Sequence, residues 1–274
     1  MSIITINNET CKKCGICQES CPATIIEKDL ATNFPIIHSE KEQFCISCGH
    51  CETVCPESAL IHTLAEGMIK PMEDGIAKID STDLGKYFRN RRSIRAYKSK
   101  QIDKAIFEEI MDIVRYAPTG TNRQMNQWII ISDPKLIAQL TEGTIQWMRA
   151  ISVANPELAQ RLNTSAIIAS FEKGNDRICR NAPHIIISYA PTTHAIAVKD
   201  TVIATSHMEL LFPSFGIGSC WAGYLMLAVQ NSPQLKSLLG LDETSTIHAA
   251  LMAGYPKYEY YKTPARKDAD VKWM

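Results

Sequence analysis

Residues 11–22 have the sequence Cys11-x-x-Cys14-x-x-Cys17-x-x-x-Cys21-Pro22, and residues 45–56 repeat it as Cys45-x-x-Cys48-x-x-Cys51-x-x-x-Cys55-Pro56. The two runs are offset by 34 residues and hold eight of the ten cysteines. A thiolate is a soft ligand that suits iron–sulfur clusters. Three thiolates on one short loop can hold three corners of a cubane cluster, and the fourth corner needs a cysteine from elsewhere. The duplicated run therefore predicts iron–sulfur clusters in the first quarter of the chain.

The spacing resembles that of the bacterial two-cluster ferredoxins, in which the fourth cysteine of each run ligates the cluster of the other run. The resemblance implies two 4Fe–4S clusters, one bound by Cys11, Cys14, Cys17 and Cys55 and the other by Cys45, Cys48, Cys51 and Cys21. Zinc binding and four disulfides are the alternatives. Zinc needs only four ligands, usually in two separated pairs, and disulfides require an oxidising compartment, which nothing else here suggests. His50, inside the second run, is expected to be a surface histidine rather than a partner of sulfur.

Length and composition indicate a two-domain protein. A chain of 274 residues suits one small and one medium domain, and a hydrophobic content of 45% is enough for a core. No apolar run approaches the length of a membrane span. The first residues, Met1–Thr5, show no basic region followed by an apolar block, so no signal peptide is expected. We therefore expect a cytoplasmic protein that does not associate with membranes.

Charge is unevenly distributed along the chain. Residues 1–70 carry five lysines and no arginine against nine acidic residues, a net charge of −4, whereas the whole chain is neutral. The remainder must carry +4, and its first arginine is Arg89. This shift marks a domain boundary, and residues 66–81, which contain Gly67, Pro71 and Gly75 and few aromatic residues, are interpreted as a linker. The ferredoxin resemblance then implies a ferredoxin domain over 1–65, followed by a second domain over 82–274. The neutral total does not favour a nucleic-acid partner.

Hydrophobic periodicity in the second domain predicts helices and strands in alternation. A helix capped by Ser81 or Thr82 is expected first, and Gly216–Trp221 is expected to form a turn. Further helices are expected over 103–116, 135–149, 156–172, 195–212 and 222–229, and strands over 128–131, 184–189 and 247–252. In the first domain, short strands are expected over 3–6 and 36–38. The pattern predicts an α+β core with three or four strands.

Three motifs lie in order along the second domain. They are Arg91-Arg92-Ser93-Ile94-Arg95, then Ala117-Pro118-Thr119-Gly120-Thr121-Asn122-Arg123-Gln124, then Gly216-Ile217-Gly218-Ser219-Cys220-Trp221. Two guanidinium groups that flank a hydroxyl can hold a phosphate through charge-assisted hydrogen bonds. Glycine in the third motif would let backbone N–H groups approach a ligand closely. Because Trp221 stands where a third glycine is needed, that motif is not the dinucleotide fingerprint. Cys179 and Cys220 are expected to be packed core cysteines.

The ordered motifs resemble those of the FMN-dependent nitroreductase family, and Ala253-Gly254-Tyr255-Pro256 resembles that family's ending. The resemblance implies an antiparallel-type sheet flanked by helices, a nitroreductase-like α/β sandwich. It also implies FMN rather than FAD, and a homodimer in which the Pro118–Gln124 loop reaches the partner's flavin. The implied FMN contacts are Arg91, Arg92, Ser93, Arg95, Pro118, Thr119, Asn122, Gln124, Ile217, Gly218, Arg266 and Lys267.

The whole chain resembles ferredoxin–nitroreductase fusions. Electrons would then pass from a low-potential, ferredoxin-like donor through two 4Fe–4S clusters to FMN, which reduces a small organic acceptor such as a nitro compound. The cofactors carry this chemistry, so no catalytic side chain is expected. Two alternatives stay open. One is an NAD(P)H-dependent nitroreductase or flavin reductase with accessory clusters, and the other is an electron-transfer subunit of a larger complex.

Overall fold

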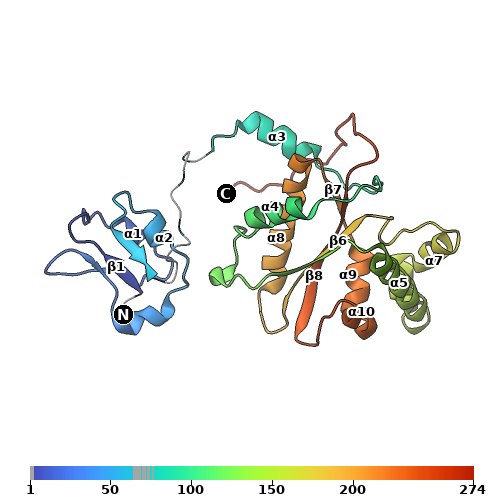
Figure 1. The fold of residues 1–274 in the computed structure, drawn as a ribbon, viewed down its shortest axis with the longest axis horizontal. Helices are drawn as coiled ribbons and strands as arrows, with labels where there is room; N and C mark the ends of the chain where they lie inside the picture. The colour runs from blue at the N-terminus through green and yellow to red at the C-terminus, as the bar shows by residue number, and fades with distance from the viewer. Residues whose placement is uncertain (1–2, 64–68, 70–71, 73–74, 76) are drawn as a thin grey trace. The chain divides into compact units, whose positions relative to one another are not determined.

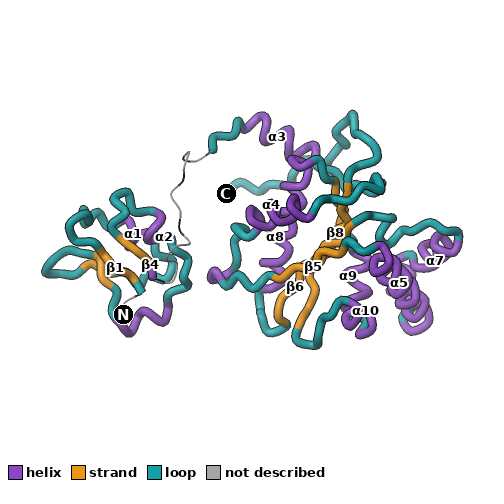
Figure 2. The backbone as a smooth tube through the Cα atoms, in the orientation of Figure 1, coloured by secondary structure: helices purple, strands orange, loops and turns teal. Residues whose placement is uncertain are grey.

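The computed structural model describes residues 3–63, 69, 72, 75 and 77–274, which form two compact units (Figures 1 and 2). One unit comprises Met1–Lys78 with Thr121–Arg123, and the other comprises Ile79–Gly120 with Gln124–Met274. Half of the expected linker, residues 66–81, falls outside the described residues, so its boundaries stay a prediction. No helix among the described residues is long and apolar enough to cross a membrane.

The first unit is a small arrangement of short elements. They are β1 (Ile4–Ile6), α1 (Ile16–Glu19), β2 (Glu27–Lys28), β3 (Pro35–Ile36), η1 (Ser39–Phe44), α2 (His50–Thr53) and β4 (Leu60–His62). β1 pairs with β4 and β2 pairs with β3, both antiparallel. The strand expected over 3–6 is confirmed, and the one expected over 36–38 lies one residue earlier. β2 and β4 are too short for periodicity to predict.

The backbone of this unit repeats at the same offset as the cysteines. The helices α1 and α2 start 34 residues apart, and each follows a glycine in the left-handed conformation, Gly15 and Gly49. Four other residues with positive φ fall into matching pairs, Lys13 with Ser47 and Thr24 with Ser58. Such backbone is uncommon away from glycine. The duplicated sequence therefore folds into two copies of the same loop-and-turn geometry.

The core of the first unit is small. Its buried apolar residues are Ile4, Ile25, Ile26, Cys51 and Leu60, and the partly buried cysteines Cys17, Cys21 and Cys45 pack against them. A domain of this size buries little of its surface and usually needs a staple such as a metal group. Several of the cysteines therefore belong to the small apolar core of this unit or pack against it.

The second unit is built on a four-stranded antiparallel sheet with the order β5-β6-β8-β7. Its strands are β5 (Gln127–Ile131), β6 (His184–Pro191), β7 (Gly218–Trp221) and β8 (Ser245–Gly254). Its helices are α3 (Ser81–Asn90), α4 (Lys104–Val114), η3 (Gly120–Asn122), α5 (Pro134–Ala154), α6 (Pro156–Leu162), α7 (Thr164–Glu172), α8 (Ala197–Leu211), η4 (Phe212–Phe215), α9 (Gly223–Gln230) and α10 (Pro233–Leu238).

Helices cover both faces of this sheet (Figure 1). Neighbouring residues of β6 alternate between the faces, because successive side chains of a strand point in opposite directions. Ile185 and Ile187 join a core with residues of α5, α7, α9 and α10, whereas Ile186 joins a core with residues of α4 and α8. The expected α+β sandwich with an antiparallel sheet is therefore confirmed.

Three details differ from the sequence expectations. Asp80, rather than Ser81 or Thr82, caps α3, since its carboxylate accepts from the backbone N–H groups of Thr82 and Asp83. Residues 218–221 form an edge strand, not the expected turn, because pairing with β8 overrides the local glycine signal. The helix expected over 156–172 is divided at Asn163, whose φ of 53° is left-handed and ends α6. The short helix α10 was not expected.

Candidate functional site

The two cysteine runs surround two separate cavities in the first unit. One cavity is lined by Cys11, Cys14, Cys17 and Cys55 together with residues of both runs. The other is lined by Cys21, Cys45, Cys48 and Cys51. Each cavity therefore gathers three cysteines of one run and the fourth cysteine of the other. These are the two ligand sets that the sequence predicts, and the residues fit cubane clusters in chemistry and in grouping.

All ten cysteines are free thiols, so the disulfide alternative finds no support in the structure. No group of three or more His, Cys, Asp or Glu residues in the described part of the chain could hold a single metal ion. Burial raises the pKa of Cys17 and Cys45, and it raises that of Cys51 to about 11 with a smaller contribution from neighbouring cysteines. A bound metal reverses this preference, because a coordinated thiol loses its proton.

His62 is a second histidine near the cysteines, and the sequence did not single it out. Its Nε2 lies 3.3 Å from Cys45 Sγ, and the residue lines the second cavity. His50, in contrast, is exposed, as expected for a surface histidine. The only signal in the sequence that points to His62 is its position 34 residues after Lys28, at the matching place in the repeat.

Motifs far apart in the sequence lie side by side at the edge of the four-stranded sheet. Ser93 forms a parallel bridge with Ser219, in which the N–H of Ile94 donates to the Ser219 carbonyl at 2.8 Å. Tyr97 forms an antiparallel bridge with Pro256. The first motif, the third motif and the C-terminal motif are thereby joined through backbone contacts.

These motifs line one open cavity of about 560 Å³, within the size range of small-molecule and cofactor sites. Of the predicted FMN contacts, Arg91, Arg92, Ile217 and Gly218 line it. The remaining walls come from Glu209 of α8 and from residues 258–263 after the last strand. The cavity has cationic, apolar and backbone groups on its wall, which is a composition that fits a phosphorylated ring cofactor.

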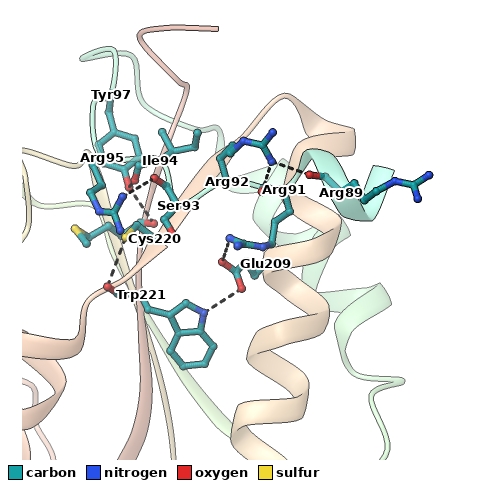
Figure 3. A network of polar contacts seen from close by, with 11 residues as sticks. Arg89, Arg91, Arg92, Ser93, Ile94, Arg95, Tyr97, Glu209, Cys220 and Trp221 are labelled. Atoms are coloured by element: carbon teal, nitrogen blue, oxygen red, sulfur yellow. Dashed lines mark hydrogen bonds and ion pairs between the residues drawn. The ribbon is translucent and has the colours of Figure 1, made fainter. Parts of the chain in front are cut away.

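Glu209 sits at the centre of a polar network on this wall (Figure 3). One carboxylate oxygen lies 3.2 Å from Arg91 Nη1, and the other accepts a hydrogen bond of 3.0 Å from Trp221 Nε1. The Glu209 side chain is 9% exposed and that of Arg91 is 31% exposed. A buried carboxylate requires such partners. Arg91 is therefore tied to α8 as well as turned toward the cavity.

The other two arginines of the first motif contact backbone carbonyls rather than a carboxylate. Arg92 donates from Nη1 to the carbonyls of Arg89 and Arg91 and from Nη2 to that of Lys262. Arg95 is exposed and makes a 3.4 Å contact with the Ser93 carbonyl. Arg92 thus links the first motif to the chain that follows the sheet.

The glycines of the third motif have a structural reason of their own. Gly216 ends η4 in the left-handed conformation with a φ of 68°. A Cβ on Gly218 would lie 2.5 Å from Ile94 Cγ1 and 2.9 Å from Pro256 Cγ. The close packing of the first, third and C-terminal motifs therefore requires glycine at position 218. This requirement holds whether or not the backbone at this position also approaches a ligand.

The Pro118–Gln124 loop does not line this cavity. Its Gly120 N–H donates to Asp200 Oδ1 at 3.0 Å, and the other oxygen of that carboxylate lies 2.9 Å from His194 Nε2. Both of these side chains are almost fully buried. Within the loop, Asn122 and Gln124 have positive φ, and Thr119 Oγ1 accepts from the Gln124 N–H. A buried carboxylate at the start of α8 thus fixes the loop's shape.

Arg266 and Lys267 lie beyond Thr263, the last residue on the cavity wall, and both are exposed. Their predicted return to a phosphate stays a prediction. Glu209 and Asp200, which hold two of the predicted motifs, were missed by the sequence analysis. Acidic residues on a helix ordinarily face solvent, and only the fold brings these two inside. Cys179 and Cys220 are buried, as expected.

Comparison with known proteins identifies a family for each of the two units. Residues 88–255 match the nitroreductase family, and residues 10–60 match a 4Fe–4S dicluster domain. A protein of Archaeoglobus fulgidus, provisionally named NADH dehydrogenase/NAD(P)H nitroreductase, is 27% identical over 188 residues, which are 68% of this chain and 93% of that protein.

Solved structures share the fold of the second unit. A nitroreductase with bound FMN from Bacteroides fragilis is 21% identical with a TM-score of 0.56, covering 70% of this chain and 98% of its own. A nitroreductase with bound FMN from Desulfitobacterium hafniense is 21% identical with a TM-score of 0.55, covering 71% and 100%. An iodotyrosine deiodinase bound to FMN and 3-iodo-L-tyrosine is 18% identical with a TM-score of 0.53, covering 70% and 98%.

Proposed function

The chain belongs to the nitroreductase family, and from this premise we propose that it is an FMN-dependent, iron–sulfur oxidoreductase in which electrons reach FMN through the preceding dicluster domain. The observation that carries the proposal is the presence of both halves in one chain. Hydride transfer from a nicotinamide to a flavin needs no iron, so a cluster domain ahead of a flavin domain implies a one-electron donor. We assign residues 1–65 to the ferredoxin domain, 66–81 to the linker and 82–274 to the flavin domain.

FMN would be held at the cavity where the first motif, the third motif and the C-terminal motif meet. Arg91 and Arg92 provide the positive charge for one terminal phosphate, and Ile217 and Gly218 provide apolar and backbone surface beside it. Ser93 and Arg95 complete the first motif. Relatives with this fold carry bound FMN, and the cavity has no dinucleotide fingerprint beside it, which favours FMN over FAD.

Two 4Fe–4S clusters would occupy the two cysteine cavities, one within each ligand set. When bound, these groups supply the chemistry, because clusters carry single electrons and FMN delivers two electrons to an organic acceptor. The protein's own residues bind the cofactors, orient them and exclude water. Each of the eight thiols would release its proton on cluster assembly, because the thiolate is the form that binds the metal.

The acceptor is proposed as a small organic molecule such as a nitro compound. The fold alone does not choose among acceptors, since proteins of this fold include nitroreductases and a deiodinase. The provisional name of the Archaeoglobus relative favours the second candidate, an NAD(P)H-dependent reductase. That relative matches a stretch of 188 residues of this chain, which leaves room for a different donor here.

We also propose a homodimer. The Pro118–Gln124 loop resembles a segment that reaches a flavin across a dimer interface, and it lies away from the wall of its own chain's cavity. The carboxylate of Asp200 fixes the shape of the loop through the Gly120 N–H. Light scattering of the FMN-loaded protein tests this, and a monomer with full FMN content contradicts it.

The experiment that tests the electron path replaces Cys14 and Cys48 with serine in the full chain. One cysteine of each ligand set is then lost while the flavin cavity stays intact. Cys179→Ala, at a buried cysteine outside both runs, is the matched control. We expect reduction of FMN by reduced ferredoxin to be lost in the double variant and kept in the control. If the double variant reduces FMN at the wild-type rate, the clusters do not carry electrons from ferredoxin to FMN. If the double variant turns over with NAD(P)H but not with reduced ferredoxin, the flavin domain also acts as an independent NAD(P)H-dependent reductase.

A further inference from the structure

His62 is the only side chain in the described part of the chain that hydrogen-bonds to a sulfur of the two cysteine runs. Its Nε2 lies 3.3 Å from Cys45 Sγ, and the residue is 1% exposed. The backbone N–H of His62 donates to Glu52 Oε2 at 2.7 Å, which fixes the end of β4 to α2. The imidazole is therefore held against the cavity lined by Cys21, Cys45, Cys48 and Cys51.

The surroundings of the ring determine which nitrogen carries the proton. Nδ1 of His62 is buried and has no hydrogen-bond partner among the described residues. A proton on Nδ1 would bury an unpaired N–H and turn the Nε2 lone pair toward the sulfur, where two acceptors would meet. A proton on Nε2 makes one hydrogen bond and leaves only a lone pair unpaired. The ring therefore donates from Nε2 to Cys45 Sγ.

The first half of the repeat has no equivalent donor. The residue 34 positions before His62 is Lys28, which lines the other cysteine cavity but is exposed. Among the described residues, no side chain hydrogen-bonds to Cys11, the counterpart of Cys45. Each cavity also has one backbone donor to a sulfur, the Ala59 N–H to Cys55 Sγ at 3.3 Å in the first and the Ser47 N–H to Cys45 Sγ at 3.4 Å in the second. The side-chain donor to a sulfur is present in the second cavity alone among the described residues.

We infer that the His62 hydrogen bond to Cys45 raises the reduction potential of the cluster bound by Cys45, Cys48, Cys51 and Cys21 above that of the other cluster. The inference rests on the proposed function, in which both cavities bind clusters. Reduction adds one electron and makes the ligand sulfurs more negative. An N–H aimed at one of these sulfurs stabilises the reduced form more than the oxidised form, and such contacts are known to set cluster potentials.

This difference in reduction potential would set the direction of electron transfer between the two clusters of the ferredoxin domain. One electron leaves the cluster of the Cys11 run, which is oxidised, and reduces the cluster of the Cys45 run. The second cluster is then the one that is reduced at equilibrium and that passes the electron on. His62 acts in this scheme as a positioning and tuning residue, since it contacts a ligand and not the iron.

The test is a potentiometric titration of the anaerobically reconstituted full chain, followed by electron paramagnetic resonance. His62→Phe keeps a flat ring but removes the donor. We expect its one-electron reduction constant for one cluster to fall by about tenfold, equivalent to about 59 mV, with the other cluster unchanged. His62→Gln keeps an N–H donor and should restore most of the shift. His50→Phe, the same substitution at an exposed histidine that lines neither cavity, should leave both potentials unchanged.

Each outcome decides the inference. Unchanged potentials in an iron-replete His62→Phe protein overturn it, and so does an equal fall in His62→Gln, because the donor and not the ring shape is invoked. If the Phe variant loses iron, the smaller His62→Leu replaces it in the same comparison. A wild-type chain that binds no cluster at all would instead overturn the proposed function. A shift of the Fe–S(Cys) vibrations in His62→Phe but not in His50→Phe provides a second, independent readout.

Discussion

Replacement of Arg91 by alanine separates two roles that the structure gives to this residue. The guanidinium lines the cavity that is proposed to bind FMN, but it also pairs with the Glu209 carboxylate at 3.2 Å. Removing one partner of a fully buried pair costs about 3–5 kcal/mol, because the other charge is left uncompensated. Glu209 keeps its bond from Trp221 and Arg91 is 31% exposed, so we expect the free energy of unfolding to fall by about 2–3 kcal/mol.

Urea unfolding of the flavin-free protein, followed by tryptophan fluorescence, measures this loss. All four tryptophans lie at or beyond residue 128, so the signal reports the second unit. The double variant Arg91→Ala with Glu209→Gln removes the stranded charge and should recover about 1–2 kcal/mol. Arg95→Ala is the control, because Arg95 is exposed and should change stability by less than about 0.5 kcal/mol.

The same variants then report on FMN. A lost hydrogen bond to a charged phosphate weakens binding by about 1–3 kcal/mol. If Arg91 contacts the phosphate, the loss of affinity persists in the double variant. If Arg91 only neutralises Glu209, the double variant regains the wild-type dissociation constant, measured by quenching of flavin fluorescence. An Arg91→Ala protein with wild-type stability and full flavin content would refute both parts of the reasoning.

Three further outcomes are expected. Anaerobically prepared protein should contain about eight irons and eight acid-labile sulfides per chain, as two cubane clusters require, whereas stoichiometric zinc without sulfide contradicts the cluster assignment. Gly218→Ala should destabilise the second unit by about 1–3 kcal/mol in urea, because its Cβ would lie 2.5 Å from Ile94 Cγ1; wild-type stability would show that Ile94 and Pro256 yield without cost. Burial lowers the pKa of His184 to about 4, so the unfolded chain binds a proton that the native chain does not. The free energy of unfolding should therefore fall by about 2–3 kcal/mol as the pH drops from about 6.5 to about 4, and an equally steep fall in His184→Gln would contradict this.

The sequence predicted most where a single local pattern determines the result. The grouping of the cysteines follows from local sequence, because three of the four cysteines that line each cavity lie within a stretch of seven residues. The long apolar segments at β6 and β8 were recognised as strands because they are buried on both faces. The order of the three motifs was enough to identify the family, although each motif alone is weak.

The sequence predicted least where a contact joins residues that are far apart. Arg91 and Glu209 are 118 positions apart, and Gly120 and Asp200 are 80 apart. Each pair depends on α8 packing against the sheet, which no local periodicity encodes. The edge strand β7 was mistaken for a turn for the same reason, since its strand character comes from its partner β8 and not from its own residues.

His62 is more informative than the cysteines about a difference in reduction potential between the two proposed clusters. The eight ligands are identical between the halves of the repeat, so they cannot give the two clusters different potentials. Any direction of electron flow within the domain must arise at positions where the halves differ. His62 and Lys28 are such a pair, and only His62 is buried against a ligand sulfur. If both cavities bind clusters, differences between matched positions such as these would determine the order of electron transfer.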